Sequence, residues 1–289
     1  MKRAFETISL LLVLTSFVNA QHVFKINITI PKTTYIVGEP VQIGISVVNI
    51  SGTTIHQTPL GFTGLRVIDE NGKEVQRGGV AGNWWSPLKN QLEPNEEDYR
   101  VIELNEYFGK PYGSLLMVEQ YFDVGRYTVR AIFYPRNQSF QAESTQVSFQ
   151  VIKPEGDELA AYNDFLEIMK NDKEHRYTDV ELAETIKSLH EAHPNSVYSP
   201  YFLENLDAIY DIPLGEHSKA LEARKELVEK YPWSVHAPAM LDGILRTMKS
   251  DSDRIEYLEK LQASSKGTLM EKIYVKKIQT ESAKGLIQK

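Results

Sequence analysis

The segment HPNSVYSPYFLENL, residues 193–206, shares the pattern P-x-S-V-x-x-P-x-x-L with YPWSVHAPAMLDGI, residues 231–244. The two copies are offset by 38 residues. The first proline of each copy is predicted to end a helix, because proline cannot continue one. The serine is predicted to cap the next helix, and the second proline falls in its first turn, where a missing N–H costs least. The pattern therefore predicts one connection between helices, used twice.

Apolar residues within the two copies follow helical spacing. Leu203 and Leu241 recur at the 38-residue offset and are predicted to point into a core, and Leu206 and Ile244 recur in the same way. Stacked helical hairpins bury a shared face that none of them can bury alone. The predicted helices cover residues 158–170, 178–192, 197–211, 216–230, 235–249, 252–263 and 266–281.

This half resembles the tetratricopeptide-repeat family. Residues 193–196 and 231–234 resemble its end-of-repeat signature in exported bacterial members, and residues 216–223 resemble the start of its second helix. The chain departs from the family in its 38-residue spacing, and it has Arg224 where an aromatic side chain is expected.

The resemblance implies that the array binds a peptide or a protein surface. Arrays of this family bind such partners on the face lined by their first helices. By analogy, five side chains are expected near that face: Tyr198, Tyr201, Asn205, His236 and Met240.

In residues 22–152 the apolar side chains recur at every second position, whereas in the second half they follow helical spacing. Residues 24–30 and 41–47 alternate apolar and polar side chains, which indicates strands with one face in a core. Asn71-Gly72 predicts a hairpin between two further strands. We expect about seven short strands that form a two-sheet sandwich. The other strands are expected at residues 65–69, 73–77, 98–104, 126–134 and 144–152.

The segment Asp123-Val124-Gly125-Arg126-Tyr127 precedes an apolar strand. Immunoglobulin-like sandwiches often have an Asp-x-Gly-x-Tyr corner there, whose tyrosine hydroxyl bonds back to the backbone. This half resembles the disulfide-free immunoglobulin-like domains of exported bacterial proteins and is similar, more loosely, to the BsuPI-type proteinase inhibitor domain. It departs from antibody-type domains at Val129, where a cysteine would be expected. The resemblance implies a fold rather than a function, because this fold has many functions.

The chain is expected to be a multidomain protein, all-β followed by all-α. An N-terminal immunoglobulin-like β-sandwich precedes a C-terminal α-helical hairpin array, which is a tetratricopeptide-like solenoid. Residues 1–20 have a basic start and an 11-residue apolar run that is too short to span a membrane, so we expect a removed signal peptide. The expected boundaries are 21–153 for the sandwich, 154–157 for a linker and 158–289 for the array.

Composition narrows the classes of function. The chain has no cysteine, which excludes thiol nucleophiles, disulfides and thiolate metal sites. An exported chain without disulfides favours a bacterial protein of the periplasm, cell envelope or extracellular space. Residues 154–289 contain 18 Lys+Arg and 25 Asp+Glu, and this negative charge argues against nucleic acid and anionic lipid partners.

No motif predicts a reaction. The sequence has no Gly-x-Ser-x-Gly elbow, no phosphate-binding glycine loop and no His-Glu-x-x-His zinc helix. His190 and His193 could form half of a metal site, but no second pair accompanies them. We therefore expect an exported scaffold protein, not an enzyme, that has no cofactor or metal and binds a protein or peptide partner.

A second candidate binding feature lies in the β half. Trp84 and Trp85 follow a glycine-rich loop, and exposed paired tryptophans would suit a sugar ring or a protein partner. Two alternatives stay open. The chain could be a proteinase inhibitor that acts through its sandwich loops, or a carbohydrate-active or hydrolytic enzyme whose site is assembled from distant residues.

Overall fold

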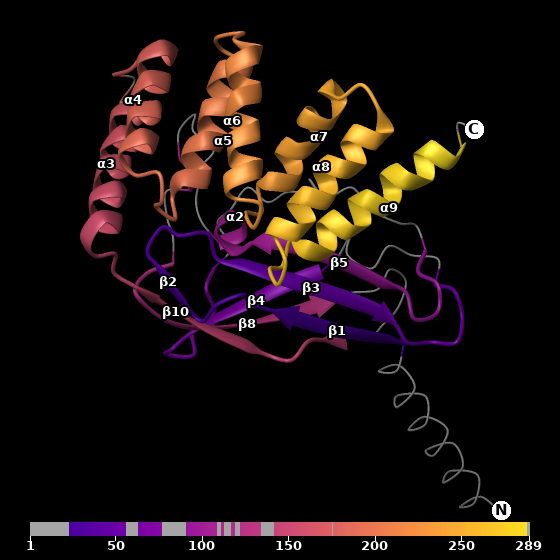
Figure 1. Ribbon diagram of the computed structural model, residues 1–289. Helices are drawn as coiled ribbons and strands as arrows, with labels where there is room; N and C mark the ends of the chain where they lie inside the picture. The colour runs from indigo at the N-terminus through magenta and orange to yellow at the C-terminus, as the bar shows by residue number, and fades with distance from the viewer. Residues whose placement is uncertain are drawn as a thin grey trace, which may run out of the picture.

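The computed structural model has a β-rich N-terminal region and a C-terminal helical array (Figure 1). The structure describes residues 23–55, 63–76, 91–108, 111–112, 117–118, 122–133, 142–174 and 176–287. The combination of a β half and an α half, predicted from the change of period, is confirmed. We call the described part up to residue 152 the β region, and residues 156–287 the helical array.

The β region contains two main sheets. The first has the strand order β1-β3-β5 and is antiparallel throughout. The second has the order β2-β10-β8-β4, with β9 paired to β8, and β2 runs parallel to β10. The first sheet consists of β1 (Phe24–Thr29), β3 (Gln42–Asn49) and β5 (Glu97–Glu103). The second consists of β2 (Thr34–Ile36), β4 (Thr63–Asp69), β8 (Gly125–Phe133), β9 (Ala142–Glu143) and β10 (Val147–Ile152).

Three short elements complete the described β region. The helix α2 (Leu104–Phe108) follows β5 directly, and β6 (Pro111–Tyr112) pairs with β7 (Met117–Val118). Helix α2 was not predicted from the sequence, because its five residues are too few for a helical period to be visible.

The central strand β3 is covered on both faces. Ile43 and Val47 point into the core between the two sheets and are fully buried. Gly44 lies on the opposite face, where an added Cβ would be 3.2 Å from Leu269 Cδ2 of the helical array. Burial on both faces explains why nearly every residue of this strand is inaccessible to solvent.

Two local predictions for the β region can be compared with the structure. The Tyr127 hydroxyl donates a hydrogen bond to the backbone oxygen of Asp123 at 2.9 Å, as the corner motif predicts. The turn at Gly72 has a positive φ of 79°, which glycine adopts without strain. The hairpin it makes is shorter than predicted, because its second arm forms one isolated bridge, between Ile68 and Glu74, and no strand.

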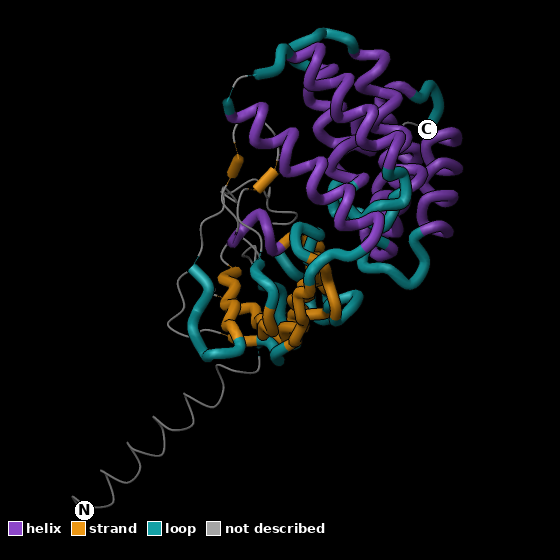
Figure 2. The backbone as a smooth tube through the Cα atoms, turned by 90° about the vertical axis from the view of Figure 1, so that its left-hand side faces the viewer, coloured by secondary structure: helices purple, strands orange, loops and turns teal. Residues whose placement is uncertain are grey.

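Seven helices form the array within the described residues, as many as the sequence predicts. They are α3 (Gly156–Lys173), α4 (Asp179–Ala192), α5 (Ser199–Asp211), α6 (His217–Lys230), α7 (Ala237–Thr247), α8 (Asp251–Ser264) and α9 (Glu271–Ile287). Helix α3 begins inside the predicted linker, and α9 begins at Glu271 rather than at residue 266. The array lies on one side of the β region, which a perpendicular view also shows (Figure 2). In the described part of the chain, no helix has the length and apolar character needed to cross a membrane.

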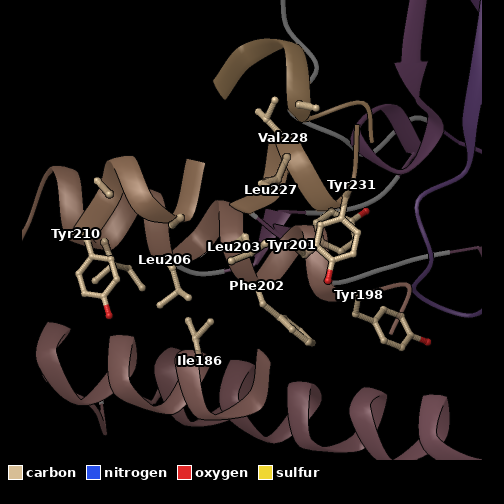
Figure 3. Close-up of a cluster of buried hydrophobic side chains, with 14 of the residues drawn as sticks. Ile186, Tyr198, Tyr201, Phe202, Leu203, Leu206, Tyr210, Leu227, Val228 and Tyr231 are labelled. Carbon is tan, nitrogen blue, oxygen red and sulfur yellow. The ribbon is translucent and has the colours of Figure 1, made fainter. Parts of the chain in front are cut away.

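Helix α5 lies at the centre of the array's core. Ten of its 13 residues are buried, and the other three, which share one side of the helix, are partly exposed. Leu206 lies toward Ile186 of α4, and the other side of α5 meets Leu227 of α6 (Figure 3). The residues predicted to recur in the core, Leu203 and Leu241 among them, are all buried.

Candidate functional site at the interface of the two regions

Three connections between helices share one backbone pattern. We call them the first, second and third joins, which comprise residues 193–198, 231–236 and 265–270. In each join a hydroxyl oxygen accepts a hydrogen bond from the backbone N–H two residues later. The bonds run from Tyr198 N to Ser196 Oγ at 3.2 Å, from His236 N to Ser234 Oγ at 3.3 Å and from Met270 N to Thr268 Oγ1 at 3.2 Å. The third join is a copy that the sequence pattern did not indicate.

The prediction that Ser196 and Ser234 cap the next helices is wrong, because their hydroxyls accept hydrogen bonds in the turns before those helices. Helices α5 and α7 begin at Ser199 and Ala237, and their N-cap residues, Tyr198 and His236, receive no side-chain cap bond. The hydroxyls instead hold the turn that precedes each helix. The second proline of each copy lies in the first helical turn, as predicted.

The first and third joins contact the β region through hydrogen bonds between a tyrosine and the backbone. The Tyr198 hydroxyl of the first join donates to the backbone oxygen of Val37 at 2.6 Å. The direction is reversed at the third join, where the Tyr99 hydroxyl of β5 donates to the backbone oxygen of Leu269 at 3.1 Å. The joins therefore attach the array to the β region.

A glycine permits the close approach at the first join. Gly38 has a positive φ of 84°, and a Cβ at this position would be 2.9 Å from Tyr162 Cε2 and 3.1 Å from Tyr198 Cε1. Any side chain would collide with the two rings as well as strain the backbone. The two tyrosine rings also lie against each other, with centroids 5.7 Å apart.

The second join meets the β region through charged side chains. His236 Nε2 lies 3.1 Å from Glu103 Oε2, and His236 Nδ1 lies 3.0 Å from Glu204 Oε2. Tyr201 donates a hydrogen bond to the other oxygen of Glu103. Glu106 completes the group, because Glu103, Glu106 and His236 each have one ligand atom within 4.8 Å of the others. We call Glu103, Glu106, Glu204 and His236 the junction cluster.

Four elements bring the junction cluster together. Glu103 is the last residue of β5, and Glu106 follows three residues later in α2, with one oxygen within 4.8 Å of a Glu103 oxygen. Glu204 is on α5, and His236 is the N-cap residue of α7. The cluster therefore joins the β region to two successive helical hairpins.

Burial and charge shift the pKa values of two members. Burial lowers the pKa of His236, but the carboxylates of Glu204 and Glu103 outweigh this effect and hold its pKa well above the usual value. Burial, followed by the neighbouring Glu103 carboxylate, raises the pKa of Glu106 to about 7. The imidazole is therefore charged at neutral pH, and Glu106 is divided between its two forms. The Glu106 carboxyl can therefore hold a proton or contact a cation.

The structure places four of the predicted partner-binding residues in the interior. Tyr198, Tyr201, Asn205 and His236 are all at least nine-tenths buried, and Met240 is partly buried. An external partner would not reach the four buried side chains in this arrangement, because the β region covers the ends of the first helices. Trp84 and Trp85 lie outside the described residues.

The two histidines considered as half of a metal site contact separate carboxylates. His190 Nε2 lies 2.9 Å from Glu226 on α6, and His193 Nε2 lies 3.4 Å from Asp164 on α3. They therefore do not converge on one point.

The three carboxylates of the junction cluster were not predicted from the sequence. One signal was present in the strand predicted at residues 98–104, where Glu103 interrupts the apolar run Val101-Ile102 and Leu104. A carboxylate inside such a run is buried, and a buried charge needs a partner. The identity of that partner could not be read from the sequence, because His236 lies 133 residues further on.

No family model and no curated protein match the chain. Among solved structures, the sporulation control protein Spo0M from Bacillus subtilis matches with a TM-score of 0.27 and 12% identity, over 52% of this chain and 55% of that one. A family 123 glycoside hydrolase from Clostridium perfringens matches with a TM-score of 0.27 and 11% identity, over 45% of this chain and 28% of the hydrolase chain. This chain therefore covers about half of the first protein and less than a third of the second.

Proposed function

We propose that the protein is an exported binding protein whose terminal helical hairpin, α3 and α4, docks a protein or peptide partner. In this proposal the β region is an immunoglobulin-like sandwich and the array is a tetratricopeptide-like solenoid. The partner is a segment with basic residues and an apolar anchor. The proposal moves the docking surface from the first-helix face expected from the sequence to the outer end of the array.

The charge distribution along the array carries the proposal. Residues 156–192, which contain α3 and α4, have ten Asp+Glu and four Lys+Arg, a formal charge of −6. Residues 193–289 have 14 of each and are neutral. A charge required only for solubility would have no reason to gather on one hairpin, whereas a concentrated charge attracts and orients an oppositely charged partner.

Exposed apolar side chains accompany this charge. Leu159 and Leu166 of α3 are 42% and 38% exposed, and Val180 of α4 is 57% exposed. The two leucines are seven residues apart, so they lie on the same side of the helix. The terminal repeat of a solenoid normally has a polar outer face. Apolar anchors within an acidic surface are a combination that suits a basic, amphipathic partner.

A crosslinking experiment tests the position of the docking surface. A photoactivatable amino acid would replace Leu166 in one variant and Lys225, an exposed residue of α6, in a matched control. Both variants would be expressed in the organism that the protein comes from, with residues 1–20 kept. We expect a discrete crosslinked partner from position 166 and none from position 225. Equal labelling at both positions, or none at position 166, would contradict the proposal.

A charge reversal tests the chemistry of the partner. Glu167→Lys with Glu184→Lys changes the terminal hairpin, and Glu222→Lys with Glu256→Lys makes the same change of net charge on α6 and α8. We expect the first pair to reduce the crosslinking yield at position 166 at least tenfold at low salt and the second to change it less than twofold. Equal losses from both pairs would show that net charge, and no particular surface, controls binding.

A further inference from the structure

Two atoms of the junction cluster form a buried ion pair that no further hydrogen bond supports. His236 Nε2 and Glu103 Oε2 are 3.1 Å apart, and among the described residues neither atom has another hydrogen-bond partner. Their residues are 7% and 1% exposed, so water does not surround them. Adjacent ligands of one metal ion are also about 3 Å apart, so the two atoms have a separation that fits a shared ion. An ion bound there would displace the imidazole proton, because a histidine ligand is neutral.

The other contacts of these residues are those that support metal ligands. The second ring nitrogen of His236 lies 3.0 Å from Glu204 Oε2, and a histidine ligand usually donates its other N–H to a carboxylate. Tyr201 donates a hydrogen bond to Glu103 Oε1, which fixes the carboxylate with its second oxygen toward the histidine. Glu106 has an oxygen within reach of the same point.

The balance of charge around the cluster also favours a cation. Three carboxylates surround one imidazole, and within the described residues no lysine or arginine forms an ion pair with Glu103, Glu106 or Glu204. A buried excess of negative charge is costly unless a cation offsets it. A divalent ion would supply two positive charges at the point where the ligand atoms converge.

We propose that Glu103, Glu106 and His236 bind one divalent transition-metal ion, with Glu204 positioning the imidazole. Two carboxylates and one imidazole suit Zn²⁺ or Mn²⁺, and Zn²⁺ binds more tightly of the two. An all-oxygen ion such as Mg²⁺ is disfavoured, because one ligand is a ring nitrogen. The ion links α2 of the β region to α7 of the array, so it clamps the two regions together. This inference goes beyond the proposed partner binding and does not depend on it.

Metal titration of the full chain tests the inference. The protein is stripped with a chelator, and Zn²⁺, Mn²⁺ and Mg²⁺ are titrated separately by calorimetry, with bound metal measured after dialysis. We expect one Zn²⁺ per chain, weaker Mn²⁺ binding and no Mg²⁺ binding at the same concentrations. We also expect Zn²⁺ to raise the melting temperature. Absence of stoichiometric Zn²⁺ binding would overturn the proposal.

Variants locate the ion. His236→Gln is expected to weaken Zn²⁺ binding at least 100-fold, and Glu106→Gln at least tenfold. The matched control is His190→Gln, because His190 is equally buried and also lies beside a carboxylate, Glu226. We expect this control to change Zn²⁺ affinity less than twofold. Equal effects of His236→Gln and His190→Gln would overturn the assignment.

A second variant covers the case in which His236→Gln does not fold. Glu106→Gln changes a partly buried residue at the edge of the cluster, and circular dichroism of the stripped protein reports whether the fold is kept. A folded Glu106→Gln protein that binds Zn²⁺ as tightly as the parent would overturn the proposed ligand set.

Discussion

The first and second joins have the same backbone pattern and different contacts with the β region. The same serine bond holds Tyr198 in one and His236 in the other at equivalent, buried positions. Tyr198 binds a neutral backbone oxygen of Val37, whereas His236 lies between the carboxylates of Glu103 and Glu204. The repeated motif therefore determines where one side chain points, and the identity of this side chain determines what the join contacts.

The largest expected effect tests whether the two hairpins are equivalent in their cores. Leu203 and Leu241 are 1% and 0% exposed at matching positions. We expect Leu203→Ala and Leu241→Ala each to lower the free energy of unfolding by about 2–5 kcal/mol, because each leaves a cavity. The exposed Leu166→Ala should cost less than about 0.5 kcal/mol. Chemical denaturation measures all three. If one core variant lost clearly less free energy of unfolding than the other, the two hairpins would not be equivalent.

An effect of intermediate size compares the stability contributed by hydrogen bonds to neutral and to charged acceptors. Tyr201→Phe removes the hydrogen bond to the buried Glu103 carboxylate and should cost about 1.5–3 kcal/mol, because hydrogen bonds to charged groups are the stronger ones. Tyr198→Phe removes the bond to the Val37 oxygen and should cost about 1 kcal/mol. Unfolding of both variants at neutral pH gives the two values. The reverse order would mean that charge is not what distinguishes the second join.

The smallest effect concerns the third join at alkaline pH. Burial, and then the nearby Glu97 carboxylate, raise the pKa of Tyr99 to about 12 in the folded chain, against about 10 in an unfolded one. A group with a raised folded pKa contributes stability that is present below pH 10 and is lost as the pH rises through 12. Between pH 9 and pH 11 the parent should therefore lose about 1 kcal/mol more than Tyr99→Phe. Equal losses in the two proteins would show that this tyrosine does not dock the third join.

The helical array was the more predictable half of the fold. Prolines at fixed spacing and apolar residues at helical spacing predicted the ends of α4 to α7 to within a few residues, because proline acts through local backbone chemistry. The third join was missed because it contains neither proline of the motif, and only the hydroxyl of Thr268 is kept. Hydroxyl residues are common in loops, so one threonine could not be recognised as a repeat from the sequence.

The candidate site was much less predictable. The family resemblance led us to expect Tyr198, Tyr201 and His236 near one face of the array, but it could not show that these side chains contact the β region. Contacts between distant segments depend on how two folded regions pack, and a periodic pattern contains no information about that packing. Glu103 and Glu106 were overlooked for the same reason, since their partner lies in the other half of the chain.

The three joins have a mechanical consequence. A solenoid that is attached at one end can stretch and recoil like a spring, because each repeat contacts only its neighbours. This array is attached to one region at three successive points, through Tyr198, His236 and Tyr99. The spacing of its helices is therefore fixed by the anchor points on the β region. A pulling force applied to the array would be shared among the three attachments, so the array should resist extension until they rupture.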